Sequence, residues 1–93
     1  MFYSLEELNL SGNRIVQIKD ESFAASSSLV ILNLSNNKLG AVRRQDLAGL
    51  ESLADLDLSY NEIDYIEENS FSHFDNLKIL DLSDNAIKQL TLG

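Results

Sequence analysis

The sequence predicts an α/β solenoid, in which stacked coils each contribute one strand to a parallel β-sheet. Three observations predict this fold class. An asparagine recurs every 24 residues, the frame Leu-x-x-Leu-x-Leu precedes each asparagine, and two apolar residues three positions apart follow it. A period of this length is the signature of a stacked repeat array. The recurring asparagines are Asn13, Asn37, Asn61 and Asn85.

The strand of each coil is predicted where two leucines stand two residues apart, because the side chains of a strand alternate between its faces. We expect these leucines to point into the core and the residues between and beside them to face outward. The inward pairs are Leu8/Leu10, Leu32/Leu34, Leu56/Leu58 and Leu80/Leu82.

Each recurring asparagine comes where the chain must turn away from its strand. A side-chain amide carries a donor and an acceptor, so it can satisfy backbone groups of its own turn and of the adjacent coil. Burying such groups unpaired would cost about 1–3 kcal/mol each. We therefore interpret the four asparagines as a structural ladder rather than as a ligand site.

The side of the coil opposite the sheet is predicted to hold the rest of the core. An anchor recurs as Phe23, Leu47 and Phe71, with Leu50 and Phe74 beneath it. Too few residues remain for a long helix, so we expect extended segments or short helical turns. The apolar pairs that follow the asparagines are Ile15/Ile18, Leu39/Val42, Ile63/Ile66 and Ile87/Leu90.

Taken together, these positions resemble the typical 24-residue subtype of the leucine-rich repeat family, over nearly the whole chain. The resemblance implies a right-handed superhelix with a parallel β-sheet on its concave face and short irregular or helical-turn segments on its convex face. It also implies protein recognition, in a receptor, adhesion or innate-immune ectodomain. That functional step is an analogy at the level of the fold.

The repeat register predicts a single array over residues 1–93. Residues 1–4 are the tail of a preceding repeat, 5–28, 29–52 and 53–76 are full repeats, and 77–93 is a partial repeat. The register begins and ends inside a repeat, and the cysteine-rich caps usual in extracellular members of the family are absent. We therefore expect an internal fragment of a longer array.

The charge balance narrows the class of partner. Fifteen acidic against seven basic residues give a net charge of −8, which disfavours nucleic acid and anionic membrane surfaces. It indicates either solubility or a basic partner surface. We find no apolar run near 18 residues and no signal-peptide pattern, so no membrane insertion is expected of this segment.

Catalytic and metal chemistry find no support in the sequence. The chain has no cysteine and one histidine, His73, with no nucleophile partnered to it. Asp55, Asp57, Asp81 and Asp84 supply oxygens, but no calcium-loop geometry fixes them. We expect no enzyme, no cofactor and no metal site.

A mixed polar and apolar surface is predicted on the outward side of the sheet. Aliphatic side chains alternate there with acids, and a tyrosine stands beside them, as in protein interfaces with an aromatic anchor. Lateral packing is the alternative interpretation. A serine column, Ser11, Ser35, Ser59 and Ser83, is expected to face outward too, and we interpret it and the Asn/Asp column before it as structural. The candidate partner-binding residues are Glu7, Ile31, Asp55, Asp57, Tyr60, Ile79 and Asp81.

Two tripeptides fit the N-glycosylation acceptor pattern, Asn9-Leu10-Ser11 and Asn33-Leu34-Ser35. The strand frame alone also produces this pattern. If the parent is secreted, glycans at Asn9 and Asn33 would mask the concave face of the first two coils.

A pair of basic residues, Arg43 and Arg44, aligns one coil away from Glu67 and Glu68. We interpret these as lateral neighbours of opposite charge that support the register.

The sequence thus predicts a protein–protein recognition module that binds a protein ligand or co-receptor, in an extracellular or cell-surface parent that could form homo- or heterodimers. A structural spacer or dimerisation array is the alternative. So is an intracellular, cytoplasmic leucine-rich repeat scaffold.

Overall fold

The computed structural model describes residues 5–19 and 22–88 of the chain. Leu90, together with the terminal segments 1–4 and 89–93 of the predicted repeats, lies outside the described residues. The elements in chain order are β1 (Glu7–Asn9), β2 (Ile31–Asn33), β3 (Ala41–Val42), the 3-10 helix η1 (Arg44–Leu47), β4 (Asp55–Asp57), β5 (Tyr65–Ile66) and β6 (Ile79–Asp81).

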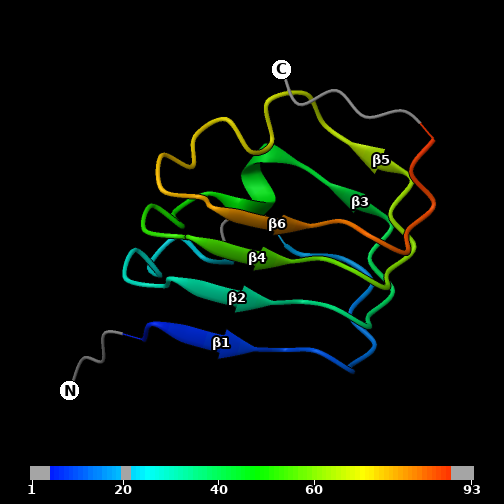
Figure 1. Cartoon of the computed structure of the whole chain (residues 1–93), viewed down its shortest axis with the longest axis horizontal. Coiled ribbons are helices and arrows are strands. Elements are labelled where there is room, and N and C mark those ends of the chain that lie inside the picture. Colours follow the sequence, from blue (N-terminus) through cyan, green and yellow to red (C-terminus); the bar gives the residue numbers. More distant parts are fainter. Residues whose placement is uncertain (1–4, 20–21, 89–93) are drawn as a thin grey trace.

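The main sheet contains four parallel strands in the order β1-β2-β4-β6 (Figure 1). Its register follows the sequence period, since Leu8 pairs with Leu32, Leu32 with Leu56, and Leu56 with Leu80. Each strand is thus contributed by the next coil. The predicted α/β solenoid with a parallel sheet is confirmed, and we call the outward side of this sheet the strand face.

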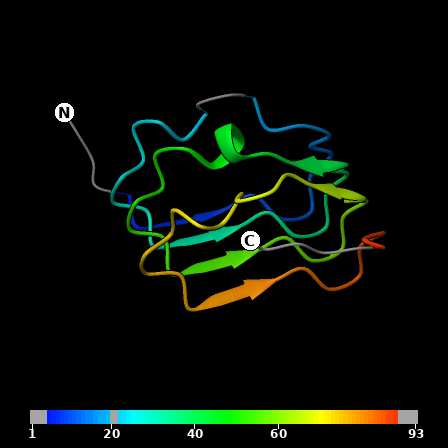
Figure 2. The ribbon, with the colours of Figure 1, turned by 90° about the horizontal axis from the view of Figure 1, so that it is seen from above.

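The opposite side of the coils carries η1 and a second, two-stranded parallel sheet, β3-β5 (Figure 2). In the latter, Ala41 pairs with Tyr65 and Val42 with Ile66. The expectation of extended segments and a short helical turn describes this side well. The pairing of β3 with β5 was not predicted, because strands of two residues show no alternation.

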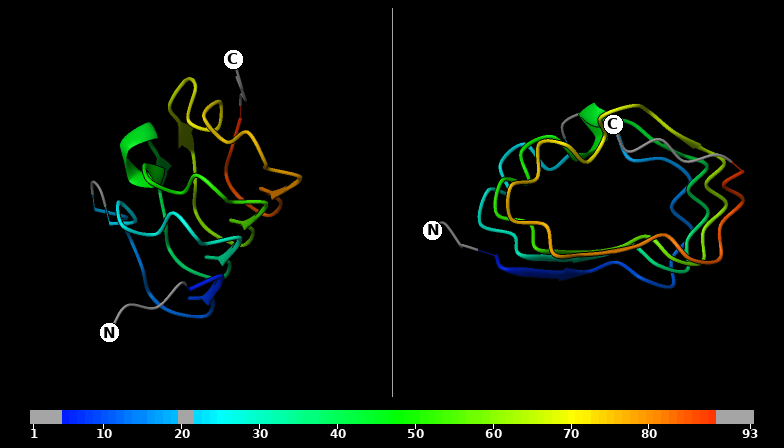
Figure 3. Two further views of the ribbon diagram at one scale, coloured as in Figure 1. Left: turned by 90° about the vertical axis from the view of Figure 1, so that its left-hand side faces the viewer. Right: turned by 45° about the horizontal axis from the view of Figure 1, so that its top comes forward.

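The core fills the space inside the coils, which stack with closely similar outlines (Figure 3). Leu32, Leu34, Leu56 and Leu58 are at most 1% exposed, and each such burial stabilises the fold by about 1.5–3 kcal/mol. The matching leucines of β1 and β6 are only partly buried, because the described residues cover them from one side. Phe23, Leu47, Leu50 and Phe74 close the core on the opposite side.

Candidate ligand-binding face

The first outward column of the strand face alternates acidic and aliphatic side chains. Glu7 lies beside Ile31, Ile31 beside Asp55, and Asp55 beside Ile79, as direct partners in the strand register. The Ile79 side chain is 56% exposed, whereas Ile31 and Asp55 are half-buried. The structure therefore brings two aliphatic groups to the solvent side of the sheet, one on each side of a carboxylate.

The second outward column lies two residues further along, at the last residue of each strand. The same turn follows it in every coil. In every coil the Oδ1 atom of the Asn or Asp accepts the serine N–H two residues later at 2.9 Å and the serine hydroxyl at 2.6 Å. Such side-chain turns favour Asn and Asp. The Ser83 hydroxyl, then the Ser83 N–H, lower the pKa of Asp81. The column consists of Asn9, Asn33, Asp57 and Asp81.

In the two middle coils the serine column does not face outward as predicted, whereas Ser83 is exposed and Ser11 half-buried. Ser35 and Ser59 are 6% and 5% exposed, because the strands end at Asn33 and Asp57 and the chain turns inward there. The alternation of faces stops where the strand stops. These serines act as donors to the turn and offer no surface to a ligand.

Tyr60 occupies a backbone position that disfavours its side chain. Its φ is 55°, in the left-handed region, and the same repeat position holds Gly12 at 70°, Asn36 at 56° and Asp84 at 55°. Glycine, asparagine and aspartate tolerate this region, whereas a bulky residue there costs about 1–2 kcal/mol. Tyr60 as a whole residue is nevertheless 56% exposed, so its burial does not compensate for much of that cost.

The surroundings of Tyr60 form a shallow depression beyond the carboxyl ends of the strands. Across it, Lys38 Nζ and Glu62 Oε2 lie 3.9 Å apart, at the surface. The depression thus offers an aromatic ring next to groups of both charges. Its lining includes Asn36, Lys38, Tyr60, Glu62 and Asp84.

Three of the recurring asparagines, Asn13, Asn37 and Asn61, also line this depression, and the amides of Asn37, Asn61 and Asn85 connect successive coils. Asn61 Oδ1 accepts the Leu39 N–H at 3.1 Å, and Asn61 Nδ2 donates to the carbonyls of Leu34 and Leu58, each at 3.0 Å. Asn37 and Asn85 repeat these contacts one coil earlier and later. Asn13 is exposed and, within the described part of the chain, donates only inside its own coil.

Comparison with known proteins agrees with this geometry. A model of the family described as "Leucine rich repeat" matches residues 3–63 and again 56–93. The chain belongs to the leucine-rich repeat family. No curated protein gave a significant match. Among solved structures, the leucine-rich repeat chain is similar to one described as "Crystal structure of TLR13-ssRNA13 complex", with 35% identity and a TM-score of 0.89. That match covers 95% of this chain and 12% of the other.

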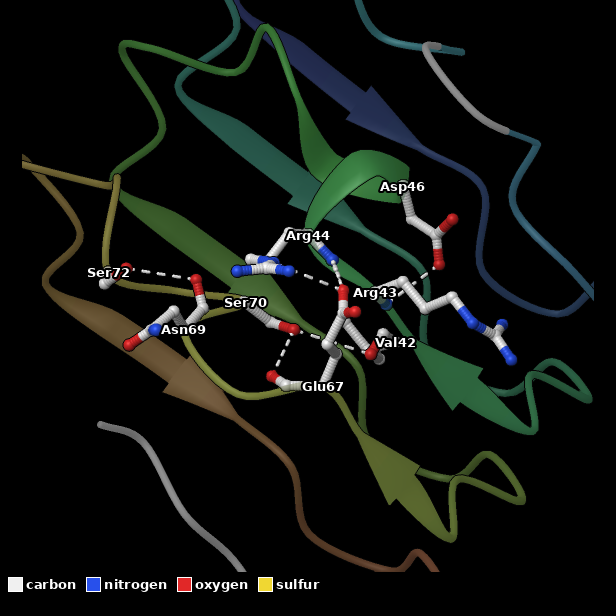
Figure 4. Close-up of polar contacts among 8 residues, drawn as sticks. All are labelled: Val42, Arg43, Arg44, Asp46, Glu67, Asn69, Ser70 and Ser72. Atoms are coloured by element: carbon white, nitrogen blue, oxygen red, sulfur yellow. Dashed lines mark hydrogen bonds and ion pairs between the residues drawn. The ribbon is translucent and has the colours of Figure 1, made fainter.

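On the side opposite the strand face, a polar cluster ties the second leucine-rich repeat to the third (Figure 4). Glu67 Oε1 accepts the Arg44 N–H at 3.0 Å and lies 3.4 Å from Arg44 Nε. These contacts, the backbone hydrogen bond foremost, lower the pKa of Glu67. The basic pair and the acidic pair are thus in contact, as predicted. The contact joins Arg44 to Glu67, although the repeat register aligns Arg44 with Glu68. The Arg43 guanidinium lies 5.8 Å from the centre of the Tyr65 ring.

Two hydrogen bonds in this cluster were not predicted from the sequence. Asp46 Oδ2 accepts the Arg43 N–H at 2.9 Å and so begins η1, and the buried Ser70 hydroxyl donates to the Glu67 carbonyl at 2.6 Å. Ser22, Asp46 and Ser70 share one repeat position, which was the available signal for a turn-forming side chain.

Outside these clusters, His73 contacts neighbouring residues of the repeat array. Its Nε2 atom lies 3.3 Å from the Leu47 carbonyl, and its ring lies 4.0 Å from the Phe74 ring. Within residues 5–19 and 22–88, no three His, Cys, Asp or Glu side chains gather as metal ligands would. No helix in this described part is long and apolar enough to cross a membrane.

Proposed function

We propose that this leucine-rich repeat chain is a protein-recognition module that binds a protein ligand on the strand face, with Tyr60 as its anchor. The carrying observation is the combination of a left-handed backbone and a half-exposed ring at Tyr60. Strain that packing does not explain is a mark of functional positions. Tyrosine is also among the residues that contribute most to protein interfaces.

The rest of the strand face supplies what such an interface needs. Ile31 and Ile79 offer apolar contact, and Asp55, Asp57 and Asp81 surround them with negative charge. A sheet whose strands are fixed by neighbouring coils is ordered before binding, which lowers the entropic cost of association. We infer that the preferred ligand presents basic side chains around an apolar centre.

A nucleic-acid ligand is the second candidate, because the similar solved structure is described as a TLR13-ssRNA13 complex. The acidic outward columns of this chain speak against it, since phosphate binding depends on clustered Lys and Arg. The chain spans only 12% of that relative, so the relative's ligand carries little weight for this segment.

We infer an extracellular or cell-surface receptor as the setting, on the strength of the family and of this relative. Binding, rather than catalysis, is the role this setting implies. A spacer or dimerisation array and a cytoplasmic scaffold are the competing roles, and the spacer role predicts no dependence of partner capture on Tyr60.

The test is affinity capture from extracellular fluid and cell-surface extract, with and without ribonuclease. The chain is compared with Tyr60→Ala and with a matched control, Tyr65→Ala, whose ring is 50% exposed on the opposite side. A protein held by wild type and Tyr65→Ala, but at least about tenfold more weakly by Tyr60→Ala, supports the proposal. Capture lost on ribonuclease treatment supports the RNA ligand instead. Equal capture by all three variants rejects Tyr60 as the anchor.

A further inference from the structure

The second outward column of the strand face contains two kinds of residue with one structural task. Asn9 and Asn33 stand in the first two coils, and Asp57 and Asp81 stand in the next two. In all four, Oδ1 alone accepts the serine N–H and hydroxyl, with the same distances of 2.9 and 2.6 Å. The turn therefore needs one side-chain oxygen, which aspartate supplies as well as asparagine.

The amide nitrogens of Asn9 and Asn33 are left over by this turn. Within the described residues, neither Nδ2 atom donates a hydrogen bond, whereas Asn37 Nδ2 donates to three carbonyls. Asn9 is exposed and Asn33 half-buried, and the described part of the chain holds no buried side-chain nitrogen without a partner. Both Nδ2 atoms thus face solvent on the strand face.

The local sequence gives these free amides a chemical meaning. Asn9 and Asn33 are the only asparagines of the chain followed two residues later by serine or threonine. This is the acceptor pattern for N-glycosylation. The pattern and a free Nδ2 atom occur together at these two residues, whereas the ladder asparagines have neither and Asn36, Asn69 and Asn76 lack the pattern.

We propose that the Asn9–Asn33 pair is an attachment site for N-linked glycan, and that the glycan shifts ligand binding toward the β6 end of the strand face. The inference rests on the proposed extracellular setting. In the reaction, Nδ2 bonds to the anomeric carbon of an oligosaccharide carried on a lipid diphosphate. The bond from that carbon to the diphosphate oxygen breaks, the lipid diphosphate leaves with the electron pair, and one amide proton passes to a base. Oδ1 is untouched, so the turn survives.

The glycan would divide the strand face by position. Asn9 and Asn33 are direct partners on β1 and β2, and neighbouring strands lie about 4.8 Å apart. A glycan on either residue therefore lies beside the outward columns of both strands, including Glu7 and Ile31, and a glycan on Asn33 also lies beside Asp57 of β4. β6, which carries Ile79, is the strand farthest from both glycans.

The experiment secretes the chain from eukaryotic cells behind a signal peptide and measures site occupancy by mass spectrometry before and after enzymatic glycan removal. Asn9→Asp, Asn33→Asp and the double variant use the residue that the array already carries at 57 and 81. We expect a glycan-dependent mass on the wild type and none on the double variant. Bare amides at both sites in secreted wild type would overturn the proposal.

A second readout separates folding from modification. Made in bacteria, without glycan, the two single variants should melt within about 2 °C of the wild type, because the turn keeps its acceptor oxygen. A larger loss would overturn the claim that Nδ2 is free of structural duty. Bare amides together with intact Tyr60-dependent capture would reject the glycan and leave the recognition proposal standing. If the glycan is present but capture does not change in Tyr60→Ala, the glycan proposal stands and the recognition proposal is rejected.

Discussion

Asn37 Oδ1 accepts the backbone N–H of Ile15 at 3.1 Å and so joins two residues of successive coils. The Nδ2 atom of the same amide donates to Leu10 O in the preceding coil and to Leu34 O in its own, each at 3.0 Å. One side chain thus satisfies backbone groups on both sides of a coil boundary. Asn61 and Asn85 have the same arrangement, which makes the coil boundary a repeated polar contact within an apolar array.

Asn37→Leu should therefore be far more damaging than its size suggests. It leaves the Ile15 N–H unpaired, at about 1–3 kcal/mol, and removes one of the two donors of the Leu34 carbonyl, which still accepts the Asn61 amide, so we expect a loss of about 2 kcal/mol or more in urea denaturation. Asn13→Leu is the matched control, because among the described residues the Asn13 amide bonds only to Leu10 O and Ser11 O, both in its own coil. We expect about 1 kcal/mol there. Equal small losses for both substitutions would count against the ladder.

Gly49 should be the least replaceable glycine. Its φ is 96°, and a Cβ built there would lie 2.6 Å from Ala24 Cα and still closer to the Phe23 carbonyl oxygen. Gly49→Ala must strain both loops, so we expect a loss of about 1–3 kcal/mol. Gly40→Ala is the control, since no atom of the described residues, its two chain neighbours aside, lies within 4 Å of its Cβ position. A stability change in Gly40→Ala that matches Gly49→Ala would contradict the close approach.

Tyr60→Asn should separate stability from function. Asn36 already holds this repeat position at a φ of 56°. Replacing an exposed, strained tyrosine by asparagine should leave the free energy of unfolding unchanged or raise it by about 1 kcal/mol, while ligand affinity falls. Thermal melts and titration with the captured ligand measure the two quantities. A marked loss of stability would show that Tyr60 is a packing residue.

The 24-residue period predicted the structural features that recur in every coil, and it did not predict those that occur in one coil or between two. The strands and their register follow from leucines and asparagines that return every 24 residues. Gly49 shares its repeat position with Ala25 and His73, so no period indicates its close approach. The β3–β5 pairing depends on tertiary contacts such as Glu67 N–H to Val42 O at 2.8 Å, which two-residue strands do not encode locally.

The positions of the candidate binding residues were predictable from strand alternation, but only as far as each strand extends. Strand alternation placed Glu7, Ile31, Asp55 and Ile79 in one outward column, as the register shows. Extending that alternation past the strand end produced the error at Ser35 and Ser59. The left-handed backbone of Tyr60 could have been inferred from the Gly, Asn and Asp at its repeat position, because these residues favour positive φ.

Acid should weaken the tie between the second and third coils. Because Arg44 lowers the pKa of Glu67 below its ordinary value of 4.5, Glu67 contributes stability that is complete above about that pH. This contribution is lost as the pH falls through the lowered folded pKa. The stability difference between wild type and Glu67→Gln should thus be constant from neutral pH down to about 4.5 and vanish in stronger acid.

Carbon-detected NMR titration of the Glu67 carboxyl, with urea denaturation across the same pH range, measures both sides of this linkage. Glu62→Gln is the control, because its pair with Lys38 is long, at 3.9 Å, and lies at the surface, where such pairs contribute about 0–1 kcal/mol. A stability difference for Glu67→Gln that persists below the folded pKa would show that the substitution acts through packing. Only a loss that tracks the titration ties the coils through the carboxylate charge that the Arg44 N–H and guanidinium hold in place.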